Sequence, residues 1–336
     1  MSQQASLVIQ TAFLGDVVLT TPLIAVLAKR GPVDVVTTPA AAGLLANNPH
    51  IREVIPYDKG GADSGLFGFL RMTRRLRSAQ YGAAYIAQAS LRSGALAAAA
   101  GIPTRTGFAT ASGRAFYTQR VAPPEGLHAS ARLLRLANGD ARPGQLSLFP
   151  GISERAAVDR LLALHEAHGD APLVALAPAS IWATKRWPYY PDLARLLAVR
   201  ARVVVLGSTD DAPLAREVCK SAGAAAVNAA GALSLLASAE LVRRCRVLVT
   251  NDSAPQHLAS AMGTPTITVF GPTVPEFGYG PLAPQSESVG VDGLSCRPCD
   301  RHGPMRCPKG HWRCMLELAP ERIAARVEHI LSQPSP

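Results

Sequence analysis

The sequence predicts an α/β protein made of two Rossmann-like domains that face each other across a cleft. Short apolar runs alternate with segments of helical period along most of the chain, which is the pattern of parallel sheets covered by helices on both faces. The alternation stops at residues 141–151, which hold two prolines and two glycines, and then starts again. With 336 residues, 48% of them hydrophobic and only 17% charged, the chain has the length and the apolar content for two packed domains.

The first half of the chain is expected to form a parallel sheet. Its first strand, residues 6–11, ends at a turn that contains a glycine, and the helix after it, residues 17–30, is followed by Gly31-Pro32, a pair that stops helices. The segments that follow alternate in the same way. We expect further strands at 33–37, 54–57 and 83–88, and further helices at 40–47, 66–79 and 92–101.

The second half repeats this pattern and defines a second domain. We expect strands at 173–177, 203–206, 247–250 and 266–270, and helices at 153–167, 191–200, 212–222, 257–262 and 321–331. The two domains therefore span residues 1–150 and 151–319, and the sequence leaves open whether the terminal helix, 320–332, packs back on the first. In open parallel sheets ligands bind beyond the carboxyl ends of the strands, so the loops there should carry the chemistry.

The charge balance is strongly basic. There are 34 Lys and Arg against 24 Asp and Glu, a net charge of +10, which favours anionic partners such as phosphorylated sugars, nucleic acid or an anionic membrane surface. Aromatic residues are scarce at 5% and no nucleic-acid-reading motif is present in the sequence, so no nucleic acid is expected. The chain starts without the features of a signal peptide, and its apolar runs are far shorter than the ~20 residues of a membrane span. We expect a cytoplasmic protein.

The loop after the first strand, Thr11-Ala-Phe-Leu-Gly-Asp16, places a carboxylate beside a glycine at the carboxyl end of a strand. It does not match the dinucleotide-binding fingerprint G-x-G-x-x-G, and the chain has no Walker A motif. Asp16 has two interpretations: it caps the N-terminus of the next helix, or it faces the cleft as a general base. This loop alone favours the cap.

Two loops of the second half have the residue types of an anion-binding site. The loop after the strand at 173–177 joins the hydroxyl group of Ser180 to Lys185, a compact cation that suits a diphosphate. A later loop brings Asp252 and Ser253 to the start of a helix, where backbone N–H groups bind anions. A solvated basic loop and an ordinary helix cap are the alternatives. The loop after the next strand, from Phe270-Gly-Pro-Thr273 to Phe277-Gly-Tyr-Gly-Pro281, is also rich in small and turn-forming residues. Two such loops at consecutive strand ends favour a phosphate cradle.

Four cysteines near the C-terminus have the number of ligands that a tetrahedral zinc site needs: Cys296, Cys299, Cys307 and Cys314. Only the first pair has the C-x2-C spacing of known zinc motifs, so reduced thiols or a disulfide are the alternatives. If zinc binds here, we expect it to be structural. The sequence predicts no obligatory cofactor.

Taken together, these motifs resemble glycosyltransferase family 9. The resemblance runs from the first strand to the C-terminal helix and rests on four segments: Phe-Leu-Gly-Asp16, Lys185-Arg-Trp-Pro, Thr-Asn-Asp-Ser253 with His257, and Phe277-Gly-Tyr-Gly-Pro. It implies a GT-B fold and an inverting transferase without an obligatory metal, peripheral on the inner face of the inner membrane. Such an enzyme moves heptose from ADP-heptose to the inner core of lipopolysaccharide (lipid A–Kdo–heptose), as the second heptose.

The resemblance also implies a role for each matching residue. Asp16 is expected to be the base that activates the acceptor hydroxyl, and Lys185 to hold the donor diphosphate. The rest of the donor site is expected at Ser180, Asp211 near the ribose, Leu233 at the adenine, and Asp252, Ser253 and His257 around the heptose and phosphates. The acceptor and anionic lipid headgroups are expected at Thr11, Arg71, Arg74, Arg92 and Arg105.

Other functions remain open from the sequence. Another family 9 transferase would move heptose to a different position of the core, and a nucleotide-sugar 2-epimerase would share the two-domain fold. A zinc-stabilised nucleic-acid-binding module would use the positive charge and the cysteines, and sequence-selective binding to RNA or DNA would reveal it.

Overall fold

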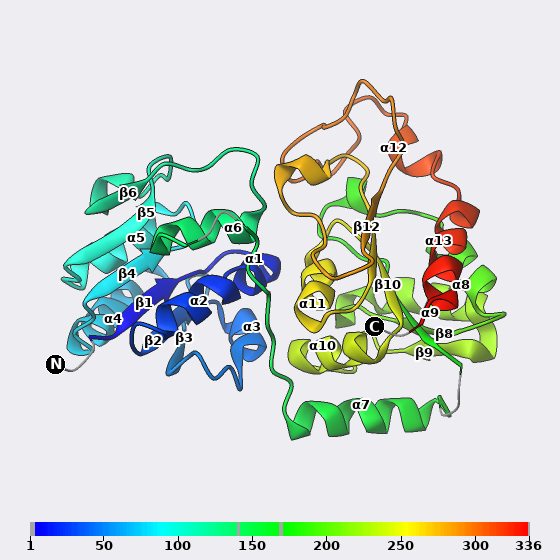
Figure 1. Ribbon diagram of the computed structural model, residues 1–336, viewed down its shortest axis with the longest axis horizontal. Coiled ribbons are helices and arrows are strands. Elements are labelled where there is room, and N and C mark those ends of the chain that lie inside the picture. Colours follow the sequence, from blue (N-terminus) through cyan, green and yellow to red (C-terminus); the bar gives the residue numbers. More distant parts are fainter. Residues whose placement is uncertain (1–3, 140–141, 168–170, 335–336) are drawn as a thin grey trace. The chain divides into compact units, whose positions relative to one another are not determined.

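The computed structural model describes residues 4–139, 142–167 and 171–334 (Figure 1). The chain divides into two compact units, residues 1–149 and 150–336, and each unit contains one sheet. The division falls within the proline- and glycine-containing stretch from which the sequence predicted a boundary.

The first unit is built on a six-stranded parallel sheet in the order β3-β2-β1-β4-β5-β6. The neighbours β1 and β4 lie at the point where the strand order reverses direction. In this topology the loops that follow those two strands leave the sheet side by side and form the usual ligand site. The strands are β1 (Ser6–Ile9), β2 (Val33–Thr37), β3 (Glu53–Pro56), β4 (Ala83–Ile86), β5 (Thr104–Phe108) and β6 (Gln119–Val121).

Six α-helices are described in this unit: α1 (Leu14–Leu19), α2 (Thr21–Ala28), α3 (Pro39–Ala42), α4 (Gly65–Ser78), α5 (Leu91–Ala99) and α6 (Ala129–Leu134). The single helix expected at 17–30 is two helices, α1 and α2. At the junction, the hydroxyl groups of Thr20 and Thr21 donate to the backbone oxygens of Asp16 (2.7 Å) and Val18 (2.8 Å). Such local bonds compete with regular helix geometry, and Pro22 then starts the second helix.

The second unit repeats the topology of the first. Its parallel sheet has the order β12-β11-β10-β7-β8-β9, so the strand order reverses between β7 and β10. The loops after β7 and β10 therefore occupy the position that the loops after β1 and β4 occupy in the first unit. The strands are β7 (Leu173–Ala177), β8 (Arg202–Val205), β9 (Ala226–Asn228), β10 (Val247–Asn251), β11 (Thr266–Val269) and β12 (Glu287–Val289).

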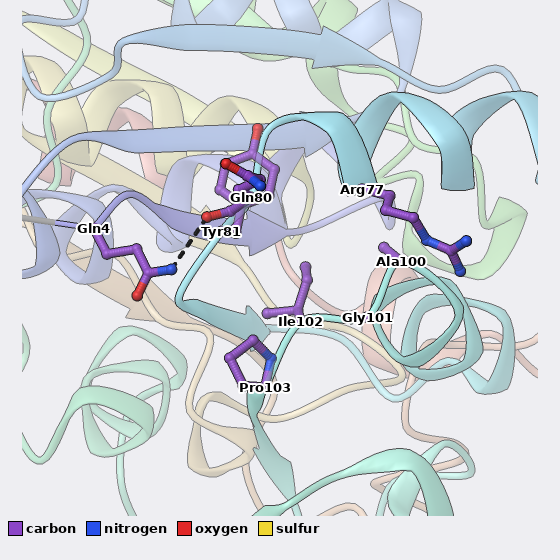
Figure 2. A pocket seen from close by; sticks show the side chains of 8 residues that line it. All are labelled: Gln4, Arg77, Gln80, Tyr81, Ala100, Gly101, Ile102 and Pro103. Atoms are coloured by element: carbon purple, nitrogen blue, oxygen red, sulfur yellow. Dashed lines mark hydrogen bonds between the residues drawn. The ribbon is translucent and has the colours of Figure 1, made fainter.

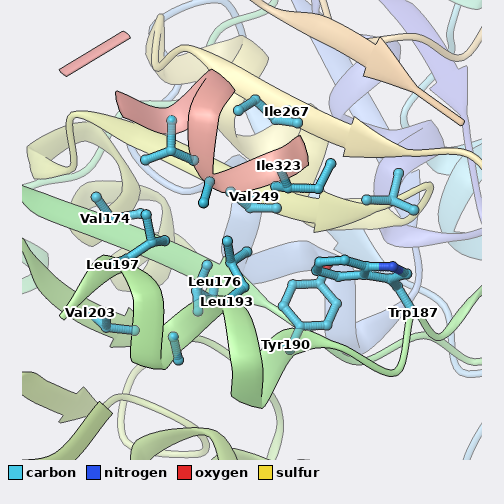
Figure 3. Packing of buried hydrophobic residues seen from close by; sticks show 14 of the residues in the cluster. Val174, Leu176, Trp187, Tyr190, Leu193, Leu197, Val203, Val249, Ile267 and Ile323 are labelled. Atoms are coloured by element: carbon cyan, nitrogen blue, oxygen red, sulfur yellow. The ribbon is translucent and has the colours of Figure 1, made fainter. Parts of the chain in front are cut away.

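The core of the second unit includes the terminal helix. Figure 3 shows Ile323 of α13 among the side chains of the sheet and of α8, and Val327 and Ile330 belong to the same buried cluster. The apolar side of the terminal helix therefore completes the core of the second unit. The described α-helices of this unit are α7 (Ile152–Leu164), α8 (Tyr190–Leu197), α9 (Ala212–Ala222), α10 (Leu235–Arg244), α11 (Ala254–Met262), α12 (Arg313–Leu316) and α13 (Pro320–Ser332).

None of the helices that the structure describes is long and apolar enough to cross a membrane.

Candidate active site

The predicted donor residues Lys185 and Asp252 meet where the strand order of the second sheet reverses. Lys185 ends a short 3-10 turn (Ala183–Lys185) in the loop after β7, and Asp252 directly follows β10. The Lys185 Nζ lies 2.6 Å from Asp252 Oδ2 and also donates to the backbone oxygen of Asp252 at 3.1 Å. Both residues are buried, with 7% and 9% of their surface exposed. The topology thus brings together two charges that are 67 residues apart in sequence.

The carboxylate of Asp252 is held by neutral donors as well as by the lysine. The hydroxyl group of Thr273 donates to Oδ2 at 2.7 Å, and the amide of Gln256 donates to Oδ1 at 3.0 Å. These contacts fix the carboxylate, which in turn fixes Lys185. An ammonium group has three N–H donors and Asp252 accepts two of them, so one remains for an anionic ligand.

The N-terminus of α11 lies beside this ion pair. Ser253 is its N-cap residue, but the serine side chain makes no capping hydrogen bond; its hydroxyl group instead donates to the backbone oxygen of Asn251 at 3.3 Å. The positive end of the nine-residue helix therefore has no side-chain cap from its N-cap residue, although Pro255 has no N–H group and the N–H of Gln256 donates to the backbone oxygen of Ser253 at 3.3 Å. His257 is in the first turns of the same helix and is buried. This arrangement suits a phosphate group.

Asn251 ties the two loops of this site together. Its Nδ2 donates to the backbone oxygen of Pro178 at 2.8 Å, and its Oδ1 accepts from the backbone N–H of Trp187 at 3.2 Å. The Trp187 ring packs beside Tyr190 in the core (Figure 3), with ring centroids 5.2 Å apart. The loop that carries Lys185 is therefore anchored at both ends.

The segment that holds the four C-terminal cysteines, residues 296–314, lies against the side chain of Lys185. The sequence did not indicate this contact. A Cβ atom on Gly303 would lie 3.2 Å from Lys185 Cε, and this glycine has a φ of +88°, which side chains disfavour. The hydroxyl group of Thr184 donates to the backbone oxygen of Pro304 in the same segment. Close approach of backbone to the lysine stem explains why a glycine stands at 303.

The other predicted donor residues follow neighbouring strands at the same edge of this sheet. Ser180 follows β7 and is 9% exposed. Asp211 follows β8, and its Oδ2 accepts from the backbone N–H (2.8 Å) and hydroxyl group (2.6 Å) of Ser208, which leaves its other oxygen for a ligand. Leu233 lies between β9 and α10, half-buried against the core. All of these side chains lie at one edge because parallel strands end together.

In the first unit, Thr11 is the centre of a polar cluster at the corresponding position. Its backbone N–H donates to Gln88 Oε1 at 3.0 Å, and its hydroxyl group accepts from Gln88 Nε2. Lys59 Nζ donates to the same hydroxyl oxygen at 2.8 Å and to the Thr11 backbone oxygen at 3.1 Å. Burial, and secondly the positive charge of Arg92, lower the pKa of Lys59. No motif marked Lys59 or Gln88, so sequence reasoning missed them.

Arg92 organises the loop that carries Lys59. Its Nε donates to the Tyr57 hydroxyl group at 2.8 Å, and its Nη2 donates to the backbone oxygens of Asp63 (2.9 Å) and Gly65 (3.3 Å). The guanidinium carbon also lies 5.2 Å from the centroid of the Tyr57 ring. Arg92, a predicted acceptor residue, is thus near the cluster around Thr11, but most of its N–H groups already donate to other groups of the protein.

Asp16 does not occupy the N-cap position that the local pattern favoured. Phe13 is the N-cap residue of α1, its side chain makes no capping bond, and Asp16 is the third residue of the helix. Asp16 is half-buried in the first turn, at the carboxyl end of β1. Asp16 is therefore not the N-cap residue, and as an acid in the first turn of α1 it lies at the end of the sheet where ligands bind.

The remaining predicted arginines are not gathered around Thr11. Arg105 is on β5 near its amino end, and its guanidinium group donates to the backbone oxygens of Ile102 and Phe116, both at 2.6 Å. Arg105 therefore lies at the amino ends of the strands, whereas Thr11 lies at their carboxyl ends. Arg105 does not fit an acceptor site around Thr11. Arg71 and Arg74 are exposed on α4, and Arg71 is paired with Asp63.

The predicted zinc site is not formed. Among the residues that the structure describes, no group of three or more His, Cys, Asp or Glu is placed to hold a metal ion, and the cysteines are free thiols. The four thiols do influence one another. Burial, and then Cys299 and the other two, raise the pKa of Cys314 to about 11. Burial acts to raise the pKa of Cys307, but backbone N–H groups of residues 309–312 outweigh it and lower that pKa.

A hollow of about 450 Å³ in the first unit is separate from these clusters (Figure 2). Gln4 precedes β1, Tyr81 precedes β4 and Pro103 precedes β5, so the hollow lies at the amino ends of the strands. Because ligands of this fold bind at the carboxyl ends, the hollow is not the candidate site. Its lining is Gln4, Arg77, Gln80, Tyr81, Ala100, Gly101, Ile102 and Pro103.

Comparisons with known proteins agree with this geometry. The model of glycosyltransferase family 9 (heptosyltransferase) matches residues 69–309. Lipopolysaccharide heptosyltransferase 2 of Salmonella typhimurium is 25% identical, over 97% of this chain and 98% of the relative, and lipopolysaccharide heptosyltransferase 1 of Pseudomonas aeruginosa is 27% identical, over 98% of both. The crystal structure of a family 9 glycosyl transferase from Veillonella parvula superposes with a TM-score of 0.88 at 22% identity, over 98% of both chains.

These matches confirm the resemblance on which the sequence-based expectation rested. The two parallel-sheet units have the GT-B fold of family 9 enzymes. The chain belongs to glycosyltransferase family 9, the heptosyltransferase family.

Proposed function

We propose that this enzyme transfers a heptosyl group from ADP-heptose to the inner core of lipopolysaccharide, where it adds the second heptose. The observation that carries the proposal is the buried pair of Lys185 and Asp252 beside the uncapped start of α11. It supplies a fixed ammonium group and the positive end of a helix at one place, as a diphosphate leaving group requires. Family membership and the named relatives favour heptose as the sugar.

In this proposal the second unit holds the donor. Lys185 and the N-terminus of α11 bind the diphosphate, and Ser180, Ser253 and His257 surround it and the heptose. Asp211 binds the ribose and Leu233 lines the adenine pocket. The pyrophosphate gains negative charge as the glycosidic bond breaks, so groups that are already oriented toward it stabilise the transition state more than the ground state. No metal ion is required for this role.

The first unit supplies the base and binds the acceptor. Asp16 accepts the proton of the acceptor hydroxyl group as its oxygen bonds to the anomeric carbon, and ADP leaves with the electron pair of the broken bond. A single displacement inverts the anomeric configuration. Thr11 and Arg92 bind the acceptor, and we add Lys59: an anionic group of the acceptor would offset the burial and the repulsion by Arg92 that lower the pKa of this lysine.

The proposal is tested by offering the enzyme two acceptors that differ in the number of heptoses they carry. The enzyme is incubated with ADP-heptose and with lipopolysaccharide cores that carry either no heptose or one, and the products are weighed by mass spectrometry. We expect one heptosyl group to be added to the core that already carries one. Addition to the heptose-free core would show that the enzyme adds the first heptose instead, a function that the similarity to heptosyltransferase 1 of Pseudomonas aeruginosa favours. Epimerised free nucleotide sugar without transfer would indicate the epimerase.

The acceptor is anchored in a membrane by its lipid, so we also propose that the enzyme works as a peripheral protein on an anionic membrane surface.

A further inference from the structure

The exposed apolar side chains of the first unit gather near one edge of its sheet. The large hydrophobic residues that are exposed among the described residues of this unit are Phe13, Leu66, Phe67, Leu70 and Leu91. Phe13 follows β1, the three residues of α4 come after β3, and Leu91 starts α5 after β4. They therefore lie in the segments that leave the carboxyl ends of the strands. A globular surface usually scatters such residues singly, and a cluster marks an interaction site.

Helix α4, which carries three of them, has two different faces. Met72 and Leu76 pack into the core of the unit. On the opposite side, Phe67, Leu70 and Arg74 are spaced three, four and seven residues apart, so they share one face of the helix. Phe67 is 87% exposed. An outward face with large apolar side chains at its start and arginines one turn later is typical of a helix that lies in the bilayer interface.

The charge of the molecule is concentrated in the same unit. Residues 1–149 contain 15 Lys and Arg against 7 Asp and Glu, a net charge of +8 out of +10 for the whole chain. On α4 itself, Arg74 has no ion-pair partner within 4.0 Å among the described residues, and the Arg71 side chain remains 62% exposed although it pairs with Asp63. This face therefore complements an anionic surface.

We propose that the outward face of α4 docks on an anionic lipid bilayer, with Leu66, Phe67 and Leu70 inserted among the lipids and Arg71 and Arg74 at the phosphate groups. The inference deepens the proposed function and rests on it for the lipid-anchored acceptor, whereas docking itself needs neither sugar substrate. Docking through α4 brings the edge of the sheet that carries Asp16 close to the plane from which the acceptor's sugars extend.

Vesicle sedimentation of the full-length enzyme tests this proposal. The probes are vesicles of phosphatidylcholine with phosphatidylglycerol in equal parts and vesicles of phosphatidylcholine alone. The variants are Leu66→Ser with Phe67→Ser, Arg74→Gln, and the matched control Val199→Ser, which changes an equally exposed residue of the second unit (82%). None of them removes a buried side chain, so the fold should be retained.

We expect the wild-type enzyme to bind the anionic vesicles and to bind neutral ones more weakly. The double variant should lose at least about tenfold in partitioning, Arg74→Gln about fivefold on anionic vesicles only, and Val199→Ser nothing. Wild-type partitioning of the double variant would overturn the proposal, even if salt and Arg74→Gln still mattered, because binding would then be electrostatic adsorption without insertion.

Two further measurements distinguish docking from two other roles of this face, in acceptor binding or in a contact between copies. The double variant should transfer heptose to a delipidated core at the wild-type rate; a loss there would place Leu66 and Phe67 in the acceptor site and overturn docking. Light scattering should give the same oligomeric state for both proteins, and a change would make the face a contact between copies instead. If the wild type transfers no heptose but binds vesicles through this face, docking stands and the proposed function fails.

Discussion

Lys185 and Asp252 are coupled so closely that substitution of one changes the state of the other. Replacing Lys185 with Met leaves a buried carboxylate whose side-chain donors among the described residues are Thr273 and Gln256. We expect a loss of about 3–5 kcal/mol in the free energy of unfolding, because an uncompensated buried charge is costly. Chemical denaturation measures this loss.

The double variant Lys185→Met with Asp252→Asn separates stability from donor binding. It removes both charges, so much of the lost stability should return. ADP affinity should stay roughly ten- to a hundredfold below that of the wild type, since a charge-assisted contact of about 1.5–3 kcal/mol is still missing. If calorimetry gave wild-type ADP affinity for the double variant, Lys185 would have a structural role only.

The sequence pointed to site residues that belong to motifs, and it missed residues that only the fold brings close to the site. Lys185 and Asp252 stand in recognisable loops, and the sheet topology explains why they meet. Lys59 has no local signal, because its contact with Thr11 depends on the loop after β3 reaching the end of β1. For Asp16 the local pattern favoured a cap, and only the helix start at Leu14 shows that the cap position belongs to Phe13.

Among the elements, α10 contains a buried acid that makes stability depend on pH. Glu240 is 1% exposed and accepts hydrogen bonds from Arg243 (2.7 and 2.8 Å) and Arg244 (2.8 Å). Burial acts to raise the pKa of Glu240, but these bonds outweigh it and lower the pKa below its ordinary 4.5. The stabilisation is therefore fully present above pH 4.5 and is lost as the pH falls through the lowered value.

Replacing Glu240 with Gln should remove this dependence. We expect the variant to lose about 1.5–3 kcal/mol at neutral pH and to show a smaller further loss in acid than the wild type. The matched control is Glu317→Gln, at the residue directly after α12. The Glu317 carboxylate pairs with Arg313 in a solvent-exposed position, so its loss should change the free energy of unfolding by less than about 1 kcal/mol. Equal acid sensitivity of the wild type and Glu240→Gln would contradict the assignment.

The sequence predicted the central strands better than the others. Each of the eight expected strands has a counterpart, whereas β5, β6, β9 and β12 were not expected. Three of these, β6, β9 and β12, are at sheet edges and have three residues each, so they bury few side chains and show no apolar run. β5 carries an arginine and a glycine among its five residues. The pairing of these four strands depends on the neighbouring strand rather than on their own composition.

For the whole molecule, the two units share one topology but differ in charge. In each, the strand order reverses between the first and fourth strands, and the candidate residues gather at that point. The first unit has a net charge of +8 and the second of +2. A strongly basic unit suits an anionic acceptor and a membrane, whereas the second unit needs local rather than overall charge to hold one nucleotide.

If the second unit is a donor-binding domain of its own, residues 150–336 should fold and bind ADP without the rest of the chain. Its core is complete because α13 contributes Ile323, Val327 and Ile330. We expect cooperative thermal unfolding and an ADP affinity close to that of the full-length enzyme. A fragment that ends at residue 319 is the control and should not fold. A folded 150–336 fragment without ADP affinity would show that the nucleotide site needs the first unit.

The division of labour between a base in the first unit and a donor site in the second is tested most directly by Asp16→Asn. Heptose transfer and ADP-heptose affinity are measured on the same folded sample. If Asp16 is the base, we expect transfer to fall by ~10²–10⁴-fold or more, with donor affinity little changed. The thermal midpoint should also change little, since Asp16 is not the N-cap residue of α1 and asparagine keeps the shape of the side chain. Substantial transfer by Asp16→Asn, or a parallel loss of donor affinity, would contradict this account.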